Sequence, residues 1–64
     1  MAYFRCYFIR TDGHIQSVKV LEAEDDAAAI LEAQSAFADQ DYPIFELWDG
    51  KRRVHLESKA LMLN

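Results

Sequence analysis

The chain has 64 residues with a formal net charge of −4, and 52% of its residues are hydrophobic. A chain of this length forms one small domain that buries only about 60% of its unfolded surface, so its stability margin is thin. The single cysteine, Cys6, excludes an internal disulfide, and no Cys/His cluster has the spacing of a zinc site. We therefore expect no metal and no cofactor, and we expect a partner subunit to add stability.

Residues 3–10 and 15–21 predict two strands joined by a tight turn. In the first range Phe4, Cys6 and Phe8 alternate with Tyr3, Arg5, Tyr7 and Ile9, and this aromatic and branched content suits a central strand. Asp12-Gly13 between two such runs is a strong hairpin signal, because glycine tolerates the positive φ of tight turns. We expect a three-residue loop that ends in a bulge, with Gly13 in the left-handed conformation.

The apolar pattern selects the register of this first hairpin. A two-residue loop would pair Tyr7 with Val18, whereas a three-residue loop pairs Cys6 with Val18 and Phe4 with Val20. A slip of one residue moves every side chain to the other side of the sheet. Because the three-residue loop places apolar residues opposite apolar residues, we predict that register.

Residues 24–40 predict a helix. Acidic residues crowd the first turn, where carboxylates interact favourably with the helix dipole, and Asp25 can act as the N-cap. Alanines raise the helix propensity of the segment. The stripe expected to face the sheet consists of Ala27, Ile30, Leu31, Gln34, Phe37 and Ala38.

Residues 44–48 and 51–57 predict a second hairpin around a two-residue loop, Asp49-Gly50. This loop pairs residue 45 with residue 54 on the core side. It also pairs Glu46 with Arg53 on the other side, and this opposite-charge pair supports the register. The core predicted beneath the helix consists of Phe4, Cys6, Phe8, Val18, Val20, Phe45, Leu47, Val54 and Leu56.

These elements predict an α+β fold of the β-β-α-β-β type, with one helix packed on one face of a four-stranded antiparallel sheet. A right-handed crossover allows the strand order 2-1-3-4, counted along the chain. The alternative, 2-1-4-3, would make the fourth strand parallel to the first. We prefer 2-1-3-4 because it centres the two most apolar strands. The domain spans residues 1–57, and residues 58–64 form a C-terminal tail.

The side of the sheet that the helix leaves uncovered carries the functional prediction. It is rich in large apolar side chains, although such a side is usually polar in an isolated domain. Its footprint is roughly 300–400 Å², a size that is often functional. We also expect Ile15, Ser17, Lys19 and Leu21 on this side. The predicted interaction surface consists of Tyr3, Arg5, Tyr7, Ile9, Ile44, Trp48, Arg53 and His55.

Two functions compete for this surface. The first is a non-enzymatic interaction module that forms a homodimer or docks a protein partner. The alternative is binding of single-stranded nucleic acid, because Arg5, Lys19, Lys51 and Arg53 outnumber Glu46 there while the helix is acidic. The overall negative charge argues mildly against nucleic acid.

The sequence predicts no enzyme. Cys6 lies on the predicted core side, where a cysteine behaves as a small apolar residue rather than as a nucleophile. No phosphate loop, paired-carboxylate site or nucleophile motif is present. Arg5 and Arg10 interrupt the first apolar run, so we expect neither a signal peptide nor a membrane span, and we expect a cytoplasmic protein.

Several segments together resemble a group of short, uncharacterised bacterial proteins. The resemblance rests on the aromatic opening strand 3–8, the turn and strand start 12–15, the acidic and alanine-rich helix start 24–29, and the closing Glu-Leu-Trp-Asp-Gly at 46–50. It covers most of residues 2–57. These motifs are turn and core signals, so the resemblance implies a shared fold, and it implies no reaction, cofactor, ligand or site residue.

Overall fold

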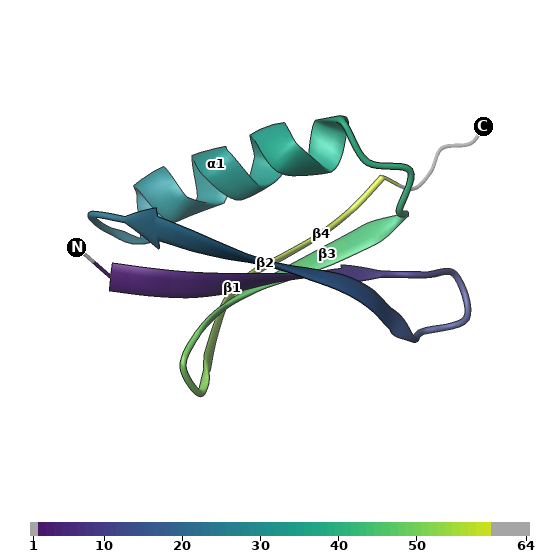
Figure 1. The fold of residues 1–64 in the computed structure, drawn as a ribbon, viewed down its shortest axis with the longest axis horizontal. Helices are drawn as coiled ribbons and strands as arrows, with labels where there is room; N and C mark the ends of the chain where they lie inside the picture. The colour runs from purple at the N-terminus through teal and green to yellow at the C-terminus, as the bar shows by residue number, and fades with distance from the viewer. Residues whose placement is uncertain (1, 60–64) are drawn as a thin grey trace.

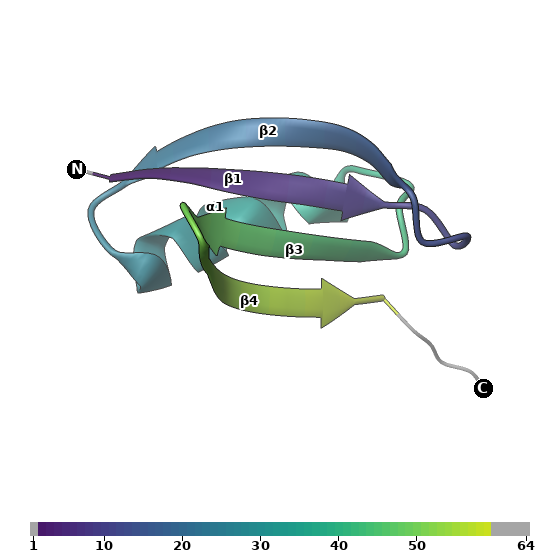
Figure 2. The same cartoon turned by 90° about the horizontal axis from the view of Figure 1, so that it is seen from below.

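A computed structural model describes residues 2–59 of the chain. Its four strands form one antiparallel sheet in the order β2-β1-β3-β4, and a single helix, α1, lies across one face (Figure 1). Figure 2 views the molecule from the side opposite the helix and shows the strands in this order. The predicted fold class and strand order are confirmed. The elements are β1 (Ala2–Ile9), β2 (Ile15–Ala23), α1 (Asp26–Ala38), β3 (Ile44–Asp49) and β4 (Arg52–Ser58).

The helix begins and ends two residues inside the predicted limits. As expected, Asp25 is the N-cap, and its side chain accepts a hydrogen bond of 2.8 Å from the backbone N–H of Ala28. Half of the predicted stripe is wrong, because Ala27, Leu31 and Ala38 are exposed, Leu31 to 67%. The buried residues of the helix are Ala29, Ala33 and Phe37. They recur every four residues, and the small alanines let the helix lie close to the sheet.

The first hairpin has the predicted loop but not the predicted register. The backbone N–H of Arg10 donates a hydrogen bond of 2.9 Å to the carbonyl of His14 and closes a three-residue loop. Within it, the N–H of Gly13 donates to the carbonyl of Arg10, and Gly13 has a φ of 89°. One step further, Ile9 pairs with Ile15 whereas Phe8 pairs with Ser17. Gln16 is therefore an extra, bulged residue. Beyond Gln16 the register is the one expected for a two-residue loop, with Tyr7 opposite Val18.

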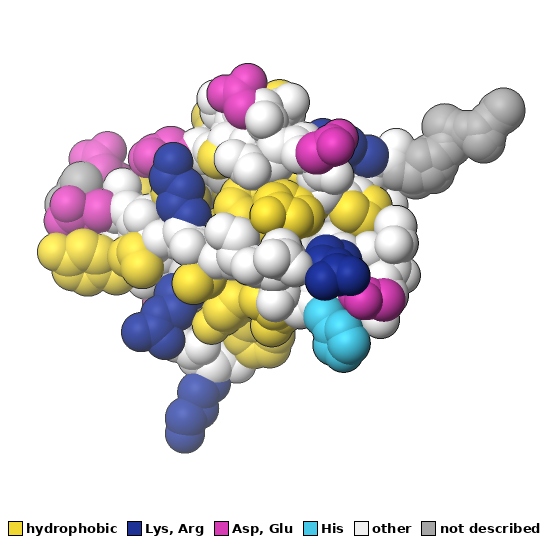
Figure 3. Space-filling model, turned by 45° about the vertical axis from the view of Figure 1, so that its right-hand side comes forward, with side chains coloured by type: hydrophobic (Ala, Val, Ile, Leu, Met, Phe, Trp, Pro, Cys, Tyr) yellow, Lys and Arg dark blue, Asp and Glu magenta, His cyan; other side chains and the backbone are white. Residues whose placement is uncertain are grey.

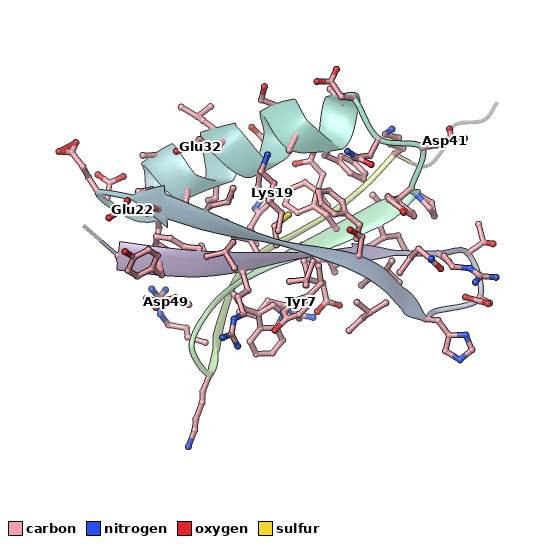
Figure 4. All side chains as sticks on the ribbon, viewed as in Figure 1. Tyr7, Lys19, Glu22, Glu32, Asp41 and Asp49 are labelled. Carbon is pink, nitrogen blue, oxygen red and sulfur yellow. The ribbon has the colours of Figure 1, made fainter. Side chains whose placement is uncertain are left out.

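This shift exchanges the two sides of β2. Val18 and Val20 were expected in the core, but they lie on the side away from the helix and are exposed. Leu21 instead enters the core, and Lys19 lies on the helix side (Figure 4). The cause is the direction in which β2 leads into α1. The helix covers the last residues of β2, where Leu21 and Ala23 are the apolar pair, so this end of the strand decides which side faces inward.

The second hairpin also differs by a bulge. Asp49 pairs with Arg52, so the two-residue loop is Gly50-Lys51 rather than Asp49-Gly50. Gly50 has a φ of 61° and takes the first loop position, where the tight turns of two-residue hairpins need a positive φ. Val54 is left without a partner, because residue 53 pairs with residue 48 and residue 55 pairs with residue 47. As a result, the predicted pairing of Glu46 with Arg53 is replaced by pairing of Glu46 with Leu56.

The core lies between α1 and the inner strands. Phe45, Leu47 and Cys6 have no measurable exposure, and Val54 packs partly buried against them as predicted. Leu56 does not join them and is 50% exposed on the other side. Residues 60–64 of the predicted tail lie outside the described residues.

An ion-pair network joins the start of the helix to the turn of the second hairpin. Arg52 donates two hydrogen bonds of 3.0 Å to the carboxylate of Asp26 and one of 3.1 Å to Asp49. The Arg52 guanidinium holds the pKa of Asp26 below its ordinary value, chiefly through these hydrogen bonds. Among the described residues, no helix has the length and apolar character needed to cross a membrane.

Candidate interaction surface

The sheet side away from α1, called the open face below, is built from alternate residues of all four strands. The strand registers place these residues there, and Figure 2 looks directly at this side. The open face consists of Tyr3, Arg5, Tyr7 and Ile9 from β1, Ile15, Val18, Val20 and Glu22 from β2, Ile44, Glu46 and Trp48 from β3, and Arg53, Leu56 and Ser58 from β4.

The open face is largely apolar, and its outer parts are exposed, whereas Ile9 is only 8% exposed and Tyr7 and Trp48 are half-buried. Tyr3 is 68% exposed, Val20 is 59% and Val18 is 53%. In Figure 3, hydrophobic side chains gather in the lower part of the view, with Lys and Arg side chains beside them. A contiguous patch of this kind on a soluble domain marks a contact surface or an aggregation hazard.

Four residues of the inner strands form the centre of the open face. Arg5 pairs with Trp48 across β1 and β3, and Tyr7 pairs with Glu46 in the next row. The indole Nε1 of Trp48 donates a hydrogen bond of 2.9 Å to Oε1 of Glu46. This bond fixes the orientation of the half-buried tryptophan. The other carboxylate oxygen of Glu46 lies 3.9 Å from Nη1 of Arg53, at the outer limit of an ion pair.

The charges of the open face are nearly balanced, which corrects the expected basic character. Lys19 lies on the helix side, as Figure 4 shows, whereas Tyr7 lies on the opposite side. Glu22 takes a place on the open face, opposite Tyr3. Arg5 has no ion pair within residues 2–59. The open face therefore presents separate positive and negative side chains surrounded by apolar ones.

A hollow of about 410 Å³ lies beside Arg5. Its lining residues come from three elements, because the turn of the second hairpin bends toward β1 and β2: Tyr3, Arg5, Val20 and Gly50. The turn hangs below the sheet in Figure 1. The open face is thus concave at this end and can receive a protruding side chain.

Seven of the eight predicted surface residues lie on the open face, and His55 does not. The unpaired Val54 turns His55 toward the helix, where its ring centroid lies 5.7 Å from that of Phe45. Three apolar residues of the open face were missed: Val18, Val20 and Leu56. The alternation of apolar and polar residues could not reveal them, because each bulge reverses which residues of the strand point toward the helix.

Polar groups on the helix side form a small cluster between α1 and β4. Gln34 Nε2 donates a 2.8 Å hydrogen bond to Oε1 of Glu57, and His55 Nε2 lies 2.9 Å from the same oxygen. These contacts hold the pKa of Glu57 below its ordinary value, and the hydrogen bond from Gln34 has the largest effect. The cluster connects two elements, and it does not border the open face.

Cys6 is fully buried in the core. Burial raises the pKa of its thiol to about 11, and the charge of Lys19 opposes this only in part. A thiol nucleophile needs the opposite, a lowered pKa with access to solvent. Within residues 2–59, no three His, Cys, Asp or Glu side chains are grouped so that they could hold a metal ion.

A comparison with known protein families, with curated proteins and with solved structures finds no match to this chain. The likeness to short bacterial proteins stays a prediction.

Proposed function

We propose that this protein is a non-enzymatic interaction module that dimerises through its open face. The observation that carries the proposal is the apolar character of a side that no element within residues 2–59 covers. Val18, Val20, Tyr3 and Leu56 are all at least half exposed there. An antiparallel sheet with one solvated side normally alternates apolar inward and polar outward residues. Here both sides are apolar, so stacking against a second copy gains free energy from burial.

The edges of the sheet support contact through the open face rather than through an edge. Exposed edge strands can pair with other chains, and bulges and inward-pointing charges prevent this. β2 carries a bulge at Gln16 and a charge, Lys19, on the helix side. β4 carries a bulge at Val54. Both edges are thus interrupted, whereas the open face is continuous.

The size of the chain also supports a second copy. A stable interface buries about 800 Å² on each partner, which is a large share of the 4283 Å² that this chain exposes. The sheet footprint of roughly 300–400 Å² is smaller than this, so the contact must use the whole open face and extend beyond its rim. It would supply the stability that a core of this small size lacks.

An enzymatic role finds no support among the described residues. The only thiol is buried with a raised pKa, and the polar cluster around Glu57 is formed by contacts that join helix to strand. An unpaired cysteine is compatible with a reducing compartment, so we place the protein in the cytoplasm.

The test is the molar mass in solution, measured by light scattering across a concentration series at low and high salt. We expect a dimer that persists at high salt, because apolar burial is not screened. Trp48→Ala removes the central aromatic residue and should weaken dimerisation about tenfold or more, while the circular dichroism of the helix stays unchanged. Leu31→Ala is the control, because it also removes a large apolar side chain from the surface, but Leu31 lies on α1. A wild-type monomer at every concentration would overturn the proposal.

Binding of single-stranded nucleic acid is the second candidate. The aromatic residues of the open face favour it, since bases stack on such side chains. The charge balance counts against it, because Lys19 is on the other side and Glu22 is on the open face. A titration with single-stranded RNA at two salt concentrations separates the two functions. Tight binding that falls steeply with salt would favour nucleic acid.

A further inference from the structure

The position of Arg5 restricts what can cover the open face. Arg5 lies between Val20 and Trp48 on neighbouring strands, and it has no carboxylate partner within residues 2–59. Burying a guanidinium group without a counter-charge is strongly unfavourable. A partner that stacks on this face must therefore bring an anionic group to Arg5.

Glu46 is suited to be that group in a second copy. It sits one strand and one row away from Arg5, in the centre of the same face. Its carboxylate accepts one hydrogen bond from Trp48 and lies 3.9 Å from Arg53. A carboxylate has about four acceptor positions, so Glu46 can accept further hydrogen bonds from an arriving guanidinium.

We infer that two copies stack with their strands crossing steeply, so that Arg5 of each copy meets Glu46 of the other. This inference rests on the proposed function. A two-fold dimer is self-complementary, so one Arg5–Glu46 contact implies the second. Arg5, Glu46, Tyr7 and Trp48 occupy the corners of a rectangle about 4.8 Å by 6.8 Å, the spacing between strands and between alternate residues. Exchanging Arg5 with Glu46 requires a two-fold axis that bisects the line between them at right angles, and this axis runs close to the other diagonal.

Such an axis has consequences for the remaining contacts. Tyr7 and Trp48 lie on or beside it, so each meets its own counterpart. With these spacings the strands of the two sheets cross at about 70°, which is closer to the orthogonal packing class than to the aligned one. The aligned class would set Arg5 over Trp48 and Glu46 over Tyr7, leaving both charges buried without an opposite charge.

The test is a charge exchange between copies. Arg5→Glu makes a copy with two acidic groups at the contact, and Glu46→Arg makes a copy with two basic groups. Each variant alone should dimerise at least tenfold more weakly than the wild type. An equimolar mixture should form a heterodimer with an affinity within a few-fold of the wild type, because both opposite-charge contacts are restored. Native mass spectrometry of the mixture identifies the heterodimer.

Glu32→Arg is the matched control, because it makes the same charge change on α1 (Figure 4). This variant should form its own homodimer and should leave Arg5→Glu monomeric. If either charge variant loses its circular dichroism, the neutral pair Arg5→Gln and Glu46→Gln replaces it. The double neutral variant should then lose less affinity than the two single losses combined.

The outcomes separate this inference from the proposed function. A wild-type dimer that Trp48→Ala weakens, but that neither charge variant affects, would overturn the crossed arrangement and leave the interaction module intact. A heterodimer that also forms with Glu32→Arg would overturn it as well, since net charge alone would then explain the pairing. A wild-type monomer would overturn both.

Discussion

At the scale of single residues, Glu57 links two elements through its protonation state. Its side chain accepts a hydrogen bond from Gln34 on α1 and contacts His55 on its own strand. Both contacts favour the charged carboxylate, so the pKa of Glu57 in the folded protein lies below its ordinary value of 4.5. This contribution to stability is present above pH 4.5 and is lost as the pH falls through the lowered pKa.

Replacing the donor tests this linkage. Gln34→Ala should lower the urea midpoint at pH 7 and should have a smaller effect below the folded pKa of Glu57, where the carboxylate is protonated. Gln40→Ala is the control, because Gln40 is an exposed glutamine outside the helix. It should leave the urea midpoint unchanged at both pH values. An NMR titration of Glu57 gives the pKa itself. A Gln34→Ala effect of equal size at both pH values would contradict the assignment.

At the scale of elements, the two edge strands share one device. Each contains a single unpaired residue, Gln16 in β2 and Val54 in β4, close to the turn that joins it to an inner strand. Gln16 is also held by its side chain, which accepts a 3.2 Å hydrogen bond from Nη1 of Arg10. A bulge twists the strand and disturbs its outer hydrogen-bonding groups, so both edges become poor templates for further strands.

Deleting Gln16 should therefore change association without changing the fold. Ile15 and Ser17 would become neighbours, and they already pair with Ile9 and Phe8, so the sides of β2 beyond this point stay the same. The regular edge should then recruit other chains, giving larger species in light scattering and thioflavin binding with normal circular dichroism. Gln16→Ala keeps the bulge and should behave as the wild type. An unchanged size distribution for the deletion would show that the bulge does not protect the edge.

Local signals in the sequence were sufficient to predict the strands, the helix and the turns. They were not sufficient to predict which side of β2 and of α1 faces the core. The left-handed Gly13, the Asp25 cap and the strand order follow from short-range chemistry and from handedness. The position of Val18 depends on a bulge, and that bulge is favourable only because α1 covers one end of β2. The prediction of the buried side of α1 was wrong for a related reason. Alanines occur on every side of α1, so the burial of Ala33 is decided by the sheet beneath it.

At the scale of the whole molecule, Cys6 is a built-in probe of global unfolding. It lies in a central strand with no measurable exposure and a raised pKa. We expect native labelling by a thiol reagent to be slow, and urea to accelerate it in proportion to the unfolded fraction. Dimerisation stabilises only folded copies, so labelling should slow further as protein concentration rises. Trp48→Ala, which weakens the dimer, should shift this concentration dependence to higher protein concentrations. Fast labelling in the absence of urea would mean that the core opens locally.

The strand order has a consequence for how the chain acquires its structure during synthesis. β1 pairs with β2 through a local hairpin, but its other partner, β3, follows about 35 residues later, since Ile9 pairs with Ile44. While the ribosome has delivered only the first hairpin and the helix, β1 has an unpaired inner edge and Phe8 lacks the neighbouring Phe45. We expect the closing of this distant ladder to be the slow step of folding, because bringing together residues far apart in the chain is entropically costly. The inner edge of β1 is therefore covered only after β3, in the last third of the chain, has been synthesised.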